Sequence, residues 1–189
     1  MSGRDAVERL RDKVAQYYGP EVTRALFPPA DDSEREVSGS ELMSDAVTPW
    51  ISAEQASSPP GGDERLVMAA LLVLLHEGGG RHKVIFMLPD LLELLGWPVA
   101  ESFWDTVERA LDFYMQPVQR EFCSPPQDGR GQEIIVTSMR KLIAGHEYYE
   151  ESEYDAPESV RLAGRQVTVT FNTDLPLGAG AAVLKSVAE

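Results

Sequence analysis

The side chains that most often carry out chemistry are few and scattered in this chain. Its three histidines are His76, His82 and His146, and their spacing matches no metal-ligand pattern. Cys123 is the only cysteine, which excludes an internal disulfide and a cysteine-based zinc site. No motif supports Cys123 and His146 as a nucleophile and its base, so we interpret the thiol as a partly buried structural group.

Two other patterns are weak as catalytic signals. Gly78-Gly79-Gly80 lies between a helical and a strand-like segment, but it lacks the Gly-Lys-Ser/Thr ending of a phosphate loop. Glu150 and Glu151 lie in a polar stretch, where solvated carboxylates are the ordinary case. We therefore expect a protein that is not an enzyme, with no catalytic residue, metal ion or cofactor, and an enzyme is the weakest alternative.

Composition is that of an ordinary globular protein, with one unusual feature in its charge. The 189 residues are 43% apolar and 25% charged, which suits one domain with an arm or tail. The longest apolar run, Leu66 to Leu75, is about half of the roughly 20 residues that span a bilayer. No basic leader opens the chain, so we expect a cytoplasmic protein without a membrane partner. The formal net charge of −14 opposes tight binding to DNA phosphates.

The first third of the chain predicts a helical arm and a linker. Apolar residues recur at helical spacing over residues 5–18, Gly19-Pro20 interrupts them, and a short helix follows over 21–27. We expect this arm, residues 1–29, to dock on the domain or on a partner. Residues 30–62 are rich in Ser, Pro, Gly and acids, which predicts a linker in which Trp50-Ile51 is the one anchor.

Residues 63–175 predict an α+β domain with the element order of a winged helix. A core helix capped by Asp63 runs to His76 or Glu77, a strand follows over 84–87, and a helix starts at Pro89 and ends at Gly96. A longer helix capped by Ser102 reaches Val118. Two strands, 133–143 and 166–171, then form a hairpin wing with an acidic tip. Residues 176–189 are expected to form a flexible tail.

Several short motifs in this domain resemble the N-terminal winged-helix domain of bacterial plasmid replication initiator proteins. They are Asp90-Leu91-Leu92, Leu95-Gly96-Trp97-Pro98, Ala110-Leu111-Asp112, the strand-like segment 134–142 and residues 167–172. The resemblance covers residues 64–175. It implies DNA binding, self-association or both during replication initiation. Such initiators usually have a second winged helix, so this chain is either a fragment or a shorter relative that keeps one module.

Charge separates two hypotheses for this domain. The family's third helix usually carries several basic residues, whereas here Arg109 lies among Glu101, Asp105, Glu108 and Asp112. If the domain binds DNA, the basic residues predicted to contact it are Arg109, Arg120, Arg130, Arg140, Lys141, Arg161 and Arg165. Each of these residues has the alternative of pairing with nearby carboxylates.

The alternative hypothesis is an acidic winged-helix adaptor that mediates protein–protein assembly without enzymatic activity. It rests on the acidic third helix and on a surplus of aromatic residues around it. A homodimer or another protein partner would bury this surplus. The predicted interface residues are Trp97, Phe103, Trp104 and Tyr114.

Overall fold

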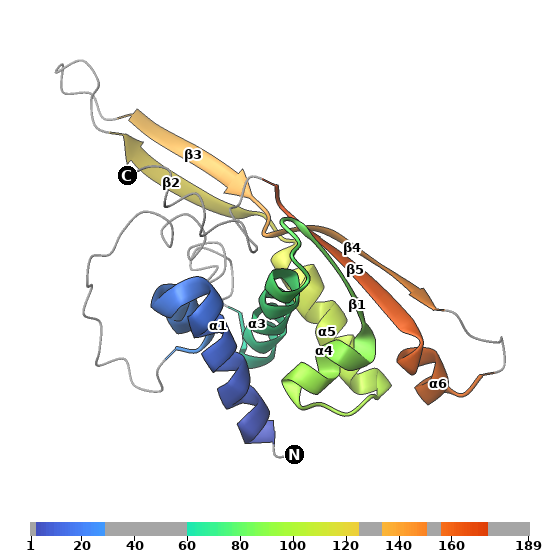
Figure 1. The fold of residues 1–189 in the computed structure, drawn as a ribbon. Helices are drawn as coiled ribbons and strands as arrows, with labels where there is room; N and C mark the ends of the chain where they lie inside the picture. The colour runs from blue at the N-terminus through green and yellow to red at the C-terminus, as the bar shows by residue number, and fades with distance from the viewer. Residues whose placement is uncertain (1–2, 29–59, 125–133, 151–155, 174–189) are drawn as a thin grey trace.

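The fold combines a cluster of helices with two antiparallel sheets and is therefore α+β, as the sequence predicts (Figure 1). A computed structural model describes residues 3–28, 60–124, 134–150 and 156–173. Most of the predicted linker with Trp50-Ile51, the predicted tail and Arg130 lie outside these ranges. No helix within them is both long enough and apolar enough to cross a membrane.

The N-terminal arm forms α1 (Gly3–Leu26), which packs against α3 and α4. Gly19 has a positive φ of 84° and precedes Pro20, so the helix bends where the sequence predicts an interruption. Leu10, Val14, Val22 and Leu26 of α1 belong to the buried core. Of the two docking sites expected for the arm, the structure places it on the domain.

The central helix is α3 (Gly62–Glu77), whose residues 67–73 and Leu75 are buried. A helix that is apolar on every face can be stable only when other elements surround it. In this fold α1, α4, α5 and β1 all contact α3. The predicted cap at Asp63 is wrong by two residues, since Gly61 is the N-cap and no side chain caps the helix.

Three short elements follow α3. The strand β1 (Lys83–Met87) leads directly into α4 (Leu88–Leu95), which ends at Gly96 with φ 69°. The next helix is α5 (Glu101–Tyr114), and its N-cap is Ala100 without a side-chain hydrogen bond, so the predicted Ser102 cap is wrong. The helix also ends before the predicted Val118, because that residue begins a strand.

Within the described ranges five strands form two separate sheets, whereas the sequence predicts three strands, two of them paired in a hairpin. The three-stranded sheet has the order β1-β5-β4, with β5 (Arg165–Phe171) antiparallel to β1 and to β4 (Ile143–Glu150). A second hairpin pairs β2 (Val118–Ser124) with β3 (Ile134–Arg140) and projects away from the helices (Figure 1). The predicted strand 133–143 is therefore divided between β3 and the start of β4.

The three-stranded sheet covers the helices with one face. Val84 and Phe86 of β1 and Val167, Val169 and Phe171 of β5 are buried on that face. The residues between them point outward, and Ile85 keeps 56% of its surface exposed. The short helix α6 (Glu158–Ala163) precedes β5. Residues 151–155 of the predicted acidic tip lie outside the described ranges. This arrangement is compatible with a winged-helix-like fold.

Candidate nucleic-acid and partner surfaces

The exposed face of α5 is acidic. Asp105 and Asp112 are exposed on this helix, and Glu101 and Glu108 are partly exposed. Arg109 is its only cation, and the guanidinium turns back onto its own helix. Its Nε donates to the carbonyl oxygen of Asp105 at 3.3 Å, and its Nη2 donates to Oγ1 of Thr106 at 3.0 Å. The face therefore repels phosphates rather than attracting them.

Arg165, which the sequence predicts as a DNA contact, is buried in this fold. Its side chain is 6% exposed, and its Nε donates to Oε1 of Glu150 at 2.6 Å. The guanidinium lies 4.4 Å from the ring centre of Trp104 and 4.7 Å from that of Tyr148. Stacking on two aromatic rings and pairing with a carboxylate hold this cation in place, although its Nη1 is buried without a hydrogen-bond partner among the described residues. The cluster joins β5, β4 and α5.

The expected aromatic interface also differs from the structure. Trp104 and Tyr114 are each only 3% exposed, because both pack into the core beneath α5. Their prediction as exposed interface residues is therefore wrong. Trp97 and Phe103 are partly buried and pack on each other, with ring centres 5.4 Å apart. The large apolar side chains that remain exposed lie elsewhere: Ile85, Val99, Tyr148, Tyr149 and Val160.

Two of the three histidines, His76 and His146, have structural contacts. Nε2 of His146 lies 3.2 Å from Oδ1 of Asp112, which joins β4 to α5. The ring of His76 stacks on Tyr17 with centres 4.1 Å apart and an interplanar angle of 12°. The side chain of Cys123 is outside the described part of the structure. Among the described residues no group of three or more His, Cys, Asp or Glu side chains is arranged to hold a metal ion.

The remaining predicted cations are spread over the fold. Lys141 is exposed just before β4, and Arg161 lies on α6 near the opposite end of the sheet. The backbone register places Arg120 opposite Ser138 and Arg140 opposite Val118 in the second hairpin. Of the predicted cations within the described ranges, Lys141, Arg140 and Arg120 therefore fall near one region, where β3 ends and β4 begins.

Two cations that were not predicted lie at the same end of the three-stranded sheet as Lys141. Arg81 and Lys83 are exposed at the start of β1, beside the point where β5 ends. The signal that marks them is the run Arg81-His82-Lys83, in which three consecutive residues carry or can carry positive charge. The run alone does not indicate a shared surface with Lys141, because its neighbours in space come from distant parts of the chain.

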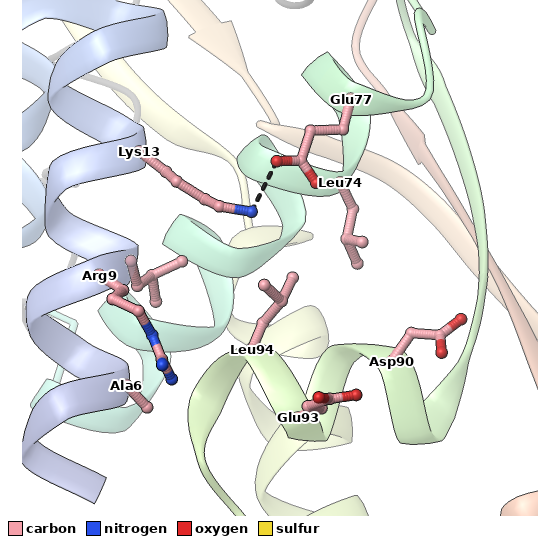
Figure 2. A pocket seen from close by; sticks show the side chains of 9 residues that line it. Ala6, Arg9, Lys13, Leu74, Glu77, Asp90, Glu93 and Leu94 are labelled. Carbon is pink, nitrogen blue, oxygen red and sulfur yellow. Dashed lines mark hydrogen bonds and ion pairs between the residues drawn. The ribbon is translucent and has the colours of Figure 1, made fainter. Parts of the chain in front are cut away.

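A groove lies between α1, the end of α3 and α4 (Figure 2). It has a volume of about 480 Å³, and leucines from all three helices line it. Arg9 and Lys13 come from the α1 wall, and Asp90 and Glu93 come from α4. Lys13 crosses to Glu77 of α3, with Nζ 2.7 Å from Oε1. The groove therefore contains one of the polar contacts that hold α1 against the domain.

Electrostatics at the Glu77 contact reflect this docking of α1. The Lys13 ammonium donates to the carboxylate and lowers the pKa of Glu77, with a further contribution from the Tyr17 hydroxyl. The same hydrogen bond raises the pKa of Tyr17, because deprotonation would place two negative charges together. Tyr18 donates to the carbonyl oxygen of Leu72 at 2.7 Å, and burial raises its pKa.

No protein-family model and no curated protein matches the chain. Among solved structures, domains 2 and 3 of RctB are similar to it with a TM-score of 0.45 and 14% sequence identity. The likeness covers 59% of this chain and 44% of the RctB chain, so this chain spans less than half of that one. A likeness of this size does not establish a family.

Proposed function

We propose that this chain is a non-enzymatic winged-helix module that acts in DNA replication initiation by contacting DNA, by self-association, or by both. The observation that carries the proposal is topology. The elements α3, β1, α4 and α5 precede β4 and β5, and the strand order is β1-β5-β4. In this reading α4 and α5 form the helix-turn-helix, β4 and β5 form the wing, and β2–β3 is an insertion before the wing.

Support for replication initiation comes from the sequence motifs and not from the fold. The motifs that resemble plasmid initiators fall on α4, α5 and β5, at Leu95-Gly96-Trp97-Pro98, Ala110-Leu111-Asp112 and residues 167–172. The structure explains the residue types in two of these motifs. Gly96 supplies the left-handed end of α4, and Ala110 and Leu111 are buried against the core.

The test measures both activities of the whole chain. An electrophoretic shift with origin-repeat DNA at low salt reports DNA contact, and light scattering over a range of protein concentrations reports self-association. We expect a salt-sensitive shift, a concentration-dependent mass, or both. A chain that stays monomeric and shifts no DNA, alone or joined to a downstream domain, would contradict the proposal.

The acidic face of α5 favours a second candidate, an adaptor that binds a basic surface of another protein. Its carboxylates repel DNA but would attract such a surface. Replacing Asp105 and Glu108 by lysine separates the two candidates. The adaptor loses its partner after this change, whereas a DNA-contacting module binds DNA more tightly because the repulsion is removed.

A further inference from the structure

We propose that DNA phosphates are contacted at one end of the three-stranded sheet, and not by the exposed face of α5. The contacting residues are Arg81, Lys83 and Lys141, which we name the sheet-end cluster. This inference rests on the DNA-contacting half of the proposed function. It assigns that contact to a surface formed where β1 and β4 begin and β5 ends (Figure 1).

Backbone hydrogen bonds bring the three cations together from distant parts of the chain. The amide of Phe171 donates to the carbonyl oxygen of His82 at 2.6 Å, which fixes the segment that carries Arg81 and Lys83. On the other side, the amide of Asn172 donates to the carbonyl oxygen of Leu142 at 3.0 Å. The two cationic segments therefore flank the end of β5, one strand spacing away on each side.

Asn172 fixes the second segment twice. Besides its backbone bond, its side-chain Nδ2 donates to the carbonyl oxygen of Lys141 at 3.1 Å. Leu142 is 2% exposed and Ile143 is fully buried, so the backbone that carries Lys141 is anchored in the core. The backbone that carries Lys141 is thus held in place, so the ordering that a ligand requires there falls on the lysine side chain.

The three side chains are exposed and available. Arg81, Lys83 and Lys141 are all exposed, and none of them takes part in an ion pair within the described ranges. Two carboxylates, Glu77 and Asp90, line the same hollow as Lys83. Glu77 already accepts hydrogen bonds from Lys13 and Tyr17, so its charge is largely compensated.

Distance protects the cluster from much of the chain's negative charge. Glu150, at the far end of β4, is seven residues beyond Ile143, or roughly 23 Å at about 3.3 Å per residue. The Debye length is about 10 Å at 0.1 M salt, so that distance exceeds two screening lengths. Asp112 of α5 lies nearer, but it contacts His146 at 3.2 Å. Glu150 therefore adds little to the potential at the three cations.

The chemistry of the cluster suits phosphates rather than base edges. Exposed ammonium and guanidinium groups at a strand end act as charges that displace counterions, which gives sequence-independent binding. The slope of log K against log salt is negative, and each neutralised phosphate contributes about 0.9 to its magnitude. Three contacts give a slope of about −2.7, so a rise from 50 to 200 mM salt weakens their contribution about 40-fold.

The test compares two charge-reversed variants of the whole chain. One is R81E/K83E/K141E, and its matched control is R4E/R11E/R24E, which changes three exposed arginines of α1. Both variants move the formal net charge from −14 to −20, because each of the three replacements changes it by −2. Binding is measured as fluorescence anisotropy of a labelled duplex from low salt upward, and circular dichroism checks that both variants are folded.

We expect the sheet-end variant to bind at least tenfold more weakly than the unchanged chain, and the control to bind less than threefold more weakly. The variant R81A/K83A/K141A should also lose about 2.7 from the salt slope. Equal losses in the two reversed variants, or no loss in either, would overturn the assignment.

Two further results would overturn the assignment while leaving the proposed function open to its own test. One is an absence of DNA binding by the unchanged chain even at low salt, since self-association by light scattering would still decide the function. The other is binding of poly-glutamate as tightly as DNA, which would assign the cluster to an acidic polypeptide.

Discussion

Removing the hydroxyl of Tyr114 should stabilise the protein. The side chain is 3% exposed, and its oxygen is buried without a hydrogen-bond partner among the described residues. Burial also raises the pKa of this phenol, because the phenolate would lose its hydration there. A buried polar group that lacks a partner costs roughly 1–3 kcal/mol. We therefore expect Tyr114→Phe to raise the free energy of unfolding by about 1 kcal/mol or more.

Tyr18 provides a matched control for the same chemical change. It is also largely buried, but its hydroxyl donates to the carbonyl oxygen of Leu72 at 2.7 Å. A satisfied hydrogen bond of this kind contributes about 1 kcal/mol net. Tyr18→Phe should therefore lower the free energy of unfolding by about that amount, opposite in sign to Tyr114→Phe.

Urea denaturation measures both changes, and thermal unfolding gives a second readout. For a chain of this length 1 kcal/mol corresponds to about 2–4 °C in Tm. The difference between the two variants should reach about 2 kcal/mol. Equal destabilisation by both substitutions would refute the reasoning, because it would mean that the Tyr114 hydroxyl has a partner in the folded protein.

Three further changes test the contacts that hold α1, α4 and the sheet in place. Gly96→Ala should destabilise the fold by about 2 kcal/mol in urea denaturation. The reason is that φ is 69° at Gly96 and that an added Cβ would lie 2.7 Å from Cβ of Ala6. Unchanged stability would show that α1 does not pack against Gly96. The pKa of Glu77 is lowered in the folded state. Its contribution to the stability of the fold is therefore present above its ordinary pKa of 4.5 and is lost as the pH falls through its pKa in the folded state. Stability between pH 6 and pH 3 should therefore fall less in Glu77→Gln, and an identical pH profile would contradict the Lys13–Glu77 contact. Arg165→Met leaves Glu150 unpaired with its side chain only 18% exposed, so it should cost about 3 kcal/mol. Adding Glu150→Met should restore part of that loss, and a double variant as unstable as the single one would place the cost in packing on Trp104 and Tyr148.

Helices could be located from the sequence because their signals are local. Apolar spacing placed α1, α3 and α4, and the stops at Gly19-Pro20, Gly78 and Gly96 follow from glycine and proline chemistry. The caps at Asp63 and Ser102 were wrong because a capping residue is optional. Ordered water can satisfy the first amides of a helix equally well.

Strand pairing was harder to predict, because the sequence of a strand does not specify which other strand it pairs with. The alternation over residues 134–143 was visible, but it could not show that Ile134–Arg140 pairs with Val118–Ser124 and that Ile143 begins another strand. The segment His146 to Glu150 was interpreted as a loop because it is polar and acidic. An edge strand with one face in solvent tolerates that composition.

The candidate surfaces were only partly predictable for the same reason. The acidity of α5 is a local property, and the exposed carboxylates agree with it. The burial of Arg165 depends on Glu150, Trp104 and Tyr148, which come from three distant segments. The sheet-end cluster likewise depends on hydrogen bonds from Phe171 and Asn172 to segments far away in the chain.

The measurement that tests the central claim most directly is amide chemical-shift mapping of the isotopically labelled chain with duplex DNA at low salt. We predict that the largest, salt-sensitive shifts fall on residues 81–83, on Lys141 and Leu142, and on Phe171 and Asn172. Shifts concentrated on Asp105 to Asp112 of α5, with none at the sheet end, would contradict it.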